Sequence, residues 1–130
     1  MQLRAMHFGV GLAGVAVFLG TGIYLRMRFP ELYATNEALR YVYRANHVYV
    51  LFASLVNLAL AVRFAAGQVG WRGKLATAGS VLALASPIVL CLAFVFEAPE
   101  VKPERILTLL GVFAAALGVT AHVVSGGGSR

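Results

Sequence analysis

Four long apolar runs, separated by short polar or charged links, dominate the pattern of hydrophobic and polar positions. The runs cover residues 5–28, 38–64, 73–96 and 104–124. Each reaches the length of about 20 residues that an α-helix needs to cross a hydrocarbon core of about 30 Å. We therefore predict a single all-α domain, a four-helix transmembrane bundle whose helices run antiparallel, up and down, with short links.

Proline and small polar residues indicate where these helices end and bend. Pro30 is expected to end the first helix, because proline lacks an N–H and disfavours a helical residue before it. Thr35 or Asn36 is expected to cap the second helix. Pro87 is expected to kink the third by depriving a backbone carbonyl of its N–H partner, and Ser86 is expected to help satisfy that carbonyl.

Small residues line the first and fourth runs, where they allow close backbone approach between helices. Through these faces we expect a homodimer. The residues are Gly9, Gly11, Gly14, Gly20 and Gly22 in the first run and Gly111, Ala115 and Gly118 in the fourth.

Composition supports a membrane protein and argues against a nucleic-acid partner. The chain is 60% hydrophobic and 12% charged, whereas a soluble domain averages about 45–50% apolar and about 25% charged residues. Its net charge of +6 comes from basic residues at the ends of the apolar runs, which is typical of membrane flanks. The single cysteine, Cys91, excludes an intramolecular disulfide and is expected to be a buried, inert thiol.

The distribution of charge across the predicted bundle suggests an orientation. Four spans place both termini on one side, and all five carboxylates and all five tyrosines of the chain lie toward the other. The terminal side is thus purely basic. Because anionic headgroups of the cytoplasmic leaflet attract basic residues, we expect both termini in the cytoplasm.

The second run carries more polar groups than any other apolar run. On a helix of about 3.6 residues per turn, Arg40, Arg44, His47, Ser54 and Asn57 fall close to one stripe, which is costly to expose to lipid. Since the arginine fork matches carboxylate and phosphate groups, we predict an interfacial pocket for an anionic small molecule, a lipid or a quinone head. The candidate ligand-binding residues are Arg26, Arg28, Arg40, Tyr43, Arg44, His47 and Asn57.

The alternative for these residues is structural. The arginines would then extend their charged ends to the interface, the tyrosines would form an aromatic belt, and His47 would bond a neighbouring carbonyl. Asn57 in particular favours a role as a polar contact between helices.

A second candidate site is the pair His7 and His122. Antiparallel packing places the start of the first helix and the end of the fourth in the same leaflet. Two facing imidazoles could ligate a b-type haem, with nearby glycines making room for the porphyrin. Apart from this alternative, the sequence predicts no cofactor and no metal.

Enzymatic arrangements are missing from the sequence. It has no aspartate, no His-Glu-x-x-His and no P-loop, and the only carboxylate in an apolar run is Glu104, at the first position of the fourth. Glu97, Glu100 and Glu104 are expected to lie in a solvated loop. We therefore expect a non-enzymatic protein.

Two stretches carry a family resemblance. Thr21-Gly-x-Tyr24-x-Arg26-x-x-x-Pro30, and Tyr43-Arg44-x-x-His47-x-Tyr49 followed by Asn57-Leu58, resemble small four-helix membrane proteins encoded in many proteobacteria. The resemblance implies the four-helix architecture, a multi-pass protein of the bacterial inner membrane, and a role for Arg26, Arg44 and His47. It implies no activity. The expected function is that of a small transporter or an accessory subunit; the alternatives are the haem protein and a structural subunit of a larger membrane complex without a ligand.

Overall fold

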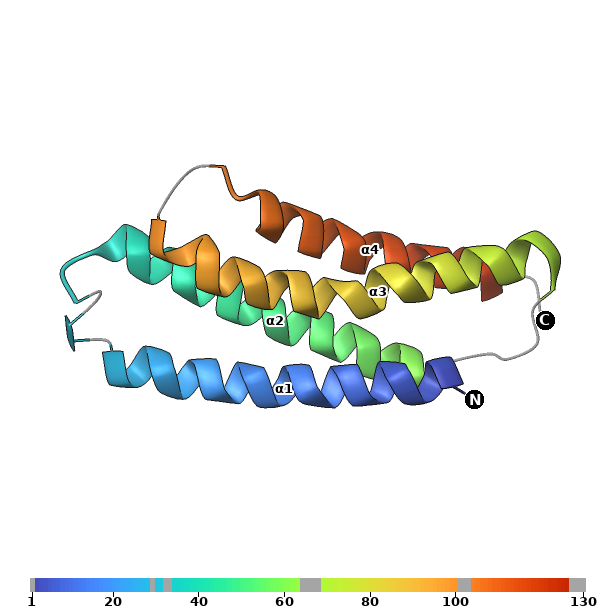
Figure 1. Cartoon of the computed structure of the whole chain (residues 1–130), viewed down its shortest axis with the longest axis horizontal. Coiled ribbons are helices and arrows are strands. Elements are labelled where there is room, and N and C mark those ends of the chain that lie inside the picture. The colour runs from blue at the N-terminus through green and yellow to red at the C-terminus, as the bar shows by residue number, and fades with distance from the viewer. Residues whose placement is uncertain (1, 29, 32–33, 64–68, 101–103, 127–130) are drawn as a thin grey trace.

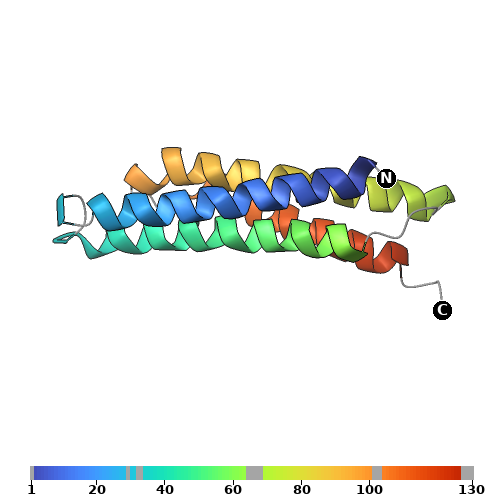
Figure 2. The ribbon, with the colours of Figure 1, turned by 90° about the horizontal axis from the view of Figure 1, so that it is seen from below.

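The computed structural model describes residues 2–28, 30–31, 34–63, 69–100 and 104–126. Its helices are α1 (Gln2–Arg28), α2 (Glu37–Arg63), α3 (Gly70–Phe96), the short 3-10 helix η2 (Ala98–Glu100) and α4 (Ile106–Gly126). Successive long helices run in opposite directions, so that the start of α1 and the end of α4 lie at the same end of the bundle (Figures 1 and 2). The predicted all-α four-helix bundle is confirmed.

All four long helices suit a membrane. Each is long and apolar enough to cross one within the described residues. At a rise of about 1.5 Å per residue, the 27 residues of α1 extend about 40 Å, beyond a hydrocarbon core of about 30 Å. Large apolar side chains from every long helix face outward, among them Leu19, Phe52, Ile88 and Phe113. A lipid solvent accounts for this surface, and the four helices are compatible with a multi-pass membrane protein.

Close packing of small residues holds the helices in two pairs, α1 with α2 and α3 with α4, which meet mainly through α2 and α3. A Cβ on Gly14 would lie 2.1 Å from Ser54 Oγ of α2. One on Gly118 would lie 2.8 Å from the backbone oxygen of Gly79 in α3. The small-residue seam of α4 is therefore used inside the chain, whereas Gly9 and Gly20 of α1 have no atom within 4 Å of such a Cβ.

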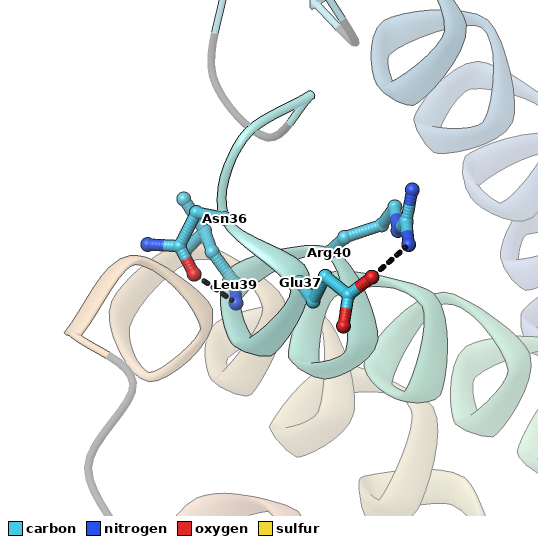
Figure 3. A network of polar contacts seen from close by, with 4 residues as sticks. All are labelled: Asn36, Glu37, Leu39 and Arg40. Carbon is cyan, nitrogen blue, oxygen red and sulfur yellow. Dashed lines mark hydrogen bonds and ion pairs between the residues drawn. The ribbon is translucent and has the colours of Figure 1, made fainter.

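The start of α2 has the predicted cap. Asn36 Oδ1 accepts a hydrogen bond from the backbone N–H of Leu39 at 3.0 Å, as Figure 3 shows. The carbonyl of Asn36 accepts the first helical bond, from the N–H of Arg40 at 3.1 Å. Of the two candidate caps, Asn36 is the one that forms.

Pro87 lies inside α3, which bends in its middle (Figure 1). Since Pro87 has no N–H, the carbonyl of Ala83, four residues earlier, loses its helical partner. Asn57 Nδ2 of α2 donates to that carbonyl at 2.7 Å. The expectation that Ser86 would satisfy it is wrong, because the Ser86 hydroxyl donates to the Gly111 carbonyl of α4 at 2.8 Å.

Candidate ligand site between the second and fourth helices

The four arginines predicted for an interfacial pocket lie at the membrane boundary opposite the termini, mostly on the surface. Arg26 and Arg44 are exposed. Arg28 Nη1 pairs with Glu31 Oε2 at 2.8 Å across a solvent-exposed turn. Arg40 Nη2 lies 3.5 Å from Glu37 Oε1 (Figure 3). In the described part of the chain, no shared hydrogen-bond or ion-pair partner brings these four arginines together.

The His47 ring contacts α1 in two ways, by stacking on one side chain and by a hydrogen bond to another. Its ring stacks on Phe18 with centroids 4.1 Å apart and planes at 16°. The Thr21 hydroxyl donates its proton to the carbonyl of Phe18, so His47 Nδ1 donates to Thr21 Oγ1 at 2.9 Å. His47 thus packs α2 against α1 close to Gly22, whose added Cβ would lie 3.3 Å from the imidazole.

Tyr43 and Asn57 are buried in different parts of the bundle. Tyr43 is 7% exposed and packs in an apolar cluster with Val42, Phe94 and Ala98. Asn57 is fully buried, and its Nδ2 donates to the carbonyls of Ala53 at 2.9 Å and Ala83 at 2.7 Å. The seven predicted residues are thus distributed over both ends of the molecule.

The histidine pair does come together. The rings of His7 and His122 approach edge to face, with centroids 5.9 Å apart and planes at 78°. Because Asn57 uses both amide protons on carbonyls, its Oδ1 accepts the bond from His7 Nδ1 at 2.7 Å. His122 Nε2 lies 2.9 Å from the Ser80 hydroxyl. Polar partners on α2 and α3 therefore orient both imidazoles.

Neighbouring side chains occupy the space beside the glycines that the haem alternative assigned to a porphyrin. A Cβ on Gly11 would lie 2.7 Å from Leu58 Cγ, and one on Gly79 would lie 2.8 Å from the Cβ of Ala121. The missing side chains of these glycines are thus used for contact between helices.

A polar network joins α2, α3 and α4 near the end of the bundle opposite the termini. The sequence did not predict it. Asn46, fully buried on α2, donates to the carbonyl of Ala93 at 3.2 Å. Its Oδ1 accepts a hydrogen bond from Arg105 Nη2, which also donates to Thr108 Oγ1 at 3.2 Å. Arg105 therefore turns inward, toward the bundle, just before α4 begins.

Glu97 completes this network, and the expectation that it lies solvated in a loop is wrong. Its carboxylate accepts bonds from the backbone N–H groups of Leu107 at 2.5 Å and Thr108 at 3.0 Å. The Thr108 hydroxyl donates to the same carboxylate at 2.7 Å. Glu97 thus caps the first turn of α4, where the helix dipole favours a negative charge. Glu100 and Glu104 are exposed, as expected.

A cavity of about 260 Å³ lies beside Arg105, between α2 and α4. Most of its wall is apolar. The lining residues are Tyr49, Arg105, Thr108, Leu109, Val112 and Phe113. Arg105 Nε is buried and has no hydrogen-bond partner in the described part of the chain. Arg105 thus adds one positive charge to the lining of a mostly apolar hollow.

The sequence shows the residues of this site, but it does not show that they lie close together. Tyr49 and Asn46 belong to the polar stretch of the second run, and Arg105 begins the fourth. Asn46 and Arg105 are 59 positions apart, and no local pattern pairs them. The only local signal is an asparagine inside a span, which is costly there without a partner.

No protein-family model, no curated protein and no solved structure matches this chain. The resemblance to small proteobacterial four-helix membrane proteins therefore stays a prediction.

Proposed function

We propose that this chain is a multi-pass protein of the bacterial inner membrane that binds the anionic head of an amphipathic molecule. The site is the cavity between α2 and α4. Arg105 supplies the charge, Tyr49 a hydroxyl, and the apolar side chains of α4 receive the rest of the molecule. Binding of this kind serves a small transporter or an accessory subunit.

One observation carries the proposal: Arg105 lines a cavity of about 260 Å³, and no carboxylate of the described residues lies within ion-pair distance of it. An anionic oxygen in the cavity would supply the missing counter-charge. Arginine is also well suited to the recognition of carboxylate and phosphate.

The proposal keeps the binding of an anionic head by arginine that the sequence predicted, but assigns it to Arg105 instead of the arginines of α1 and α2. Arg26 and Arg44 lie exposed at the same boundary, line no part of the cavity and have no part in binding in this proposal. Arg28, Arg40, Tyr43, His47 and Asn57 act in this proposal as structural contacts. We further propose that the end opposite the termini faces the periplasm.

The test is mass spectrometry of the small molecules that co-purify with the wild-type chain, with Arg105→Gln and with Arg44→Gln. We expect an acidic amphiphile that is lost with Arg105→Gln and kept with Arg44→Gln, since Arg44 lines no part of the cavity. Identical extracts from all three proteins would contradict the proposal.

The haem alternative is supported by one observation, the close approach of His7 and His122. It predicts a Soret band in the purified protein that disappears with His7→Ala. We rank it second, because side chains of α2 and α4 occupy the space beside Gly11 and Gly79. A colourless protein would remove it.

A further inference from the structure

The identity of the ligand can be narrowed from the donors, charges and dimensions of the cavity; this step rests on the proposed function. Arg105 is held in place before any ligand arrives, because Asn46 and Thr108 both accept bonds from its Nη2. Its Nε is buried beyond the reach of a ligand, so a ligand contacts Arg105 through the part of the side chain that lines the cavity. A site whose cation is fixed in advance loses little side-chain entropy on binding.

Charge favours an anion over a neutral head such as a quinone. Arg28 pairs with Glu31 and Arg40 with Glu37, whereas no carboxylate of the described residues lies within ion-pair distance of Arg105. The nearby carboxylate of Glu97 is engaged by the N–H groups of Leu107 and Thr108. The start of α4 offsets part of its negative charge, so part of the guanidinium charge is left for a ligand.

The shape of the cavity favours one chain. The cavity of about 260 Å³ is open on one side, so it receives the head and the first methylenes of a ligand and leaves the rest outside. Its apolar wall comes mainly from one face of α4, which suits a single acyl chain.

The apolar wall leads from Arg105 into the membrane. Leu109, Val112 and Phe113 follow Arg105 by four, seven and eight residues, a spacing that keeps them on one face of α4. Leu109 is 55% and Phe113 is 57% exposed, so the lower wall borders the lipid. A chain that begins at the guanidinium can continue along this face into the bilayer.

We propose that the ligand of this cavity is a single-chain carboxylate amphiphile, a free fatty acid. Its carboxylate lies against the guanidinium of Arg105 and neutralises the positive charge. Its first methylenes lie against Leu109, Val112 and Phe113, and the remainder of the chain lies among the lipids.

The experiment is native mass spectrometry of the full chain released from nonionic detergent, titrated with palmitate, with hexadecanol or with phosphatidylglycerol. Hexadecanol keeps the chain and removes the charge. We expect palmitate to bind, hexadecanol to bind far more weakly, and Arg105→Gln to raise the Kd for palmitate roughly ten- to a hundredfold, as loss of a charged hydrogen bond does. Arg44→Gln should leave the Kd unchanged.

A second variant tests the cavity without touching the network of Arg105. Leu109→Trp enlarges a lining side chain that is more than half exposed, and it should reduce palmitate binding while the protein stays folded. This keeps the test decisive if Arg105→Gln fails to fold.

The outcomes separate the two proposals. Binding of phosphatidylglycerol that depends on Arg105, with none of palmitate, overturns the fatty acid and leaves the proposed function standing. Palmitate binding that neither Arg105→Gln nor Leu109→Trp weakens overturns the fatty acid at this site. If no probe binds in a way that depends on Arg105 or Leu109, both proposals fail.

Discussion

At the scale of single residues, the most consequential contact is the one between Asn57 and the Ala83 carbonyl. Pro87 removes the N–H that this carbonyl would accept from its own helix. Asn57 supplies a donor from α2 at 2.7 Å, and its other groups bond Ala53 and His7. The Asn57 amide thus satisfies the free carbonyl of α3 and orients the imidazole of His7 on α1.

This arrangement predicts an energetic coupling between positions 57 and 87. Hydrogen bonds between membrane helices contribute about 0.6 kcal/mol on average and up to about 1.7, so Asn57→Ala, which loses three, should lower the free energy of unfolding by about 2 kcal/mol. In a Pro87→Ala background the new N–H can bond Ala83, and the cost should fall by about 1 kcal/mol. Unfolding in SDS measures both.

Thr120→Ala is the control for that cycle, because the Thr120 hydroxyl is exposed and bonds only a carbonyl of its own helix in the described structure. Its free energy of unfolding should stay within about 0.5 kcal/mol of the wild type. Strictly additive effects of Asn57→Ala and Pro87→Ala would refute the coupling.

At the scale of helices, glycine position decides which faces approach one another. Gly118 and Gly79 bring the backbones of α4 and α3 into direct contact, whereas Gly20 on α1 faces open space. The glycines expected to support a homodimer are thus of two kinds, those used inside the chain and those left on the surface of α1. Self-association stays a prediction, and only the outer glycines are free to serve it.

Two identical substitutions separate these roles. Gly118→Ala places a Cβ against backbone atoms of Gly79 and Ala83, and the forced separation of α3 and α4 should cost about 1–3 kcal/mol. Gly20→Ala meets nothing within 4 Å and should be neutral or gain up to about 1 kcal/mol from helix propensity. Unfolding in SDS compares them; equal effects would contradict the packing described.

At the scale of the whole molecule, charge and hydrogen bonding distinguish the two ends. The end opposite the termini holds Glu97, Arg105 and the exposed arginines Arg26 and Arg44. The other end holds the His7–His122 pair and the exposed basic residues Arg4 and Lys74. The attraction of basic residues to anionic headgroups is the basis of the proposal that the terminal end faces the cytoplasm.

Orientation can be tested in cells with a membrane-impermeant maleimide. In a Cys91→Ser background, a cysteine at the exposed position Glu100 should react from the periplasmic side, and one at the exposed position Gln2 should react only after the inner membrane is opened. The reverse pattern would invert the proposed topology.

The sequence was sufficient for the architecture and insufficient for the site, for a physical reason. Apolar runs, Pro87 and the Asn36 cap are local signals, and each reports on its own helix. The rotation of α2 about its axis is set by its neighbours: Arg44 is exposed while Asn46, two positions later, is fully buried. From the polar stripe we expected Arg44 and His47 to line one pocket. In the structure His47 contacts α1, and Asn46 instead contacts Arg105.

For the histidine pair, too, the sequence predicted the position along the helices but not the packing around it. Antiparallel helices placed His7 and His122 in one leaflet, which a count of residues could foresee. The glycines beside them were open to two interpretations, as room for a cofactor or as contact surfaces. Only the neighbouring helices, through Leu58 and Ala121, decide how that space is filled.

The bond from Asn57 to Ala83 also has a consequence for natural variation. A chain that keeps proline at position 87 needs a donor at position 57, and a chain that loses the proline is released from that need. Across descendants of a common ancestor, the two positions should therefore change together although 30 residues separate them along the chain. Bilayer thickness and lipid composition would leave this pairing untouched, since it concerns a backbone carbonyl that no lipid can satisfy.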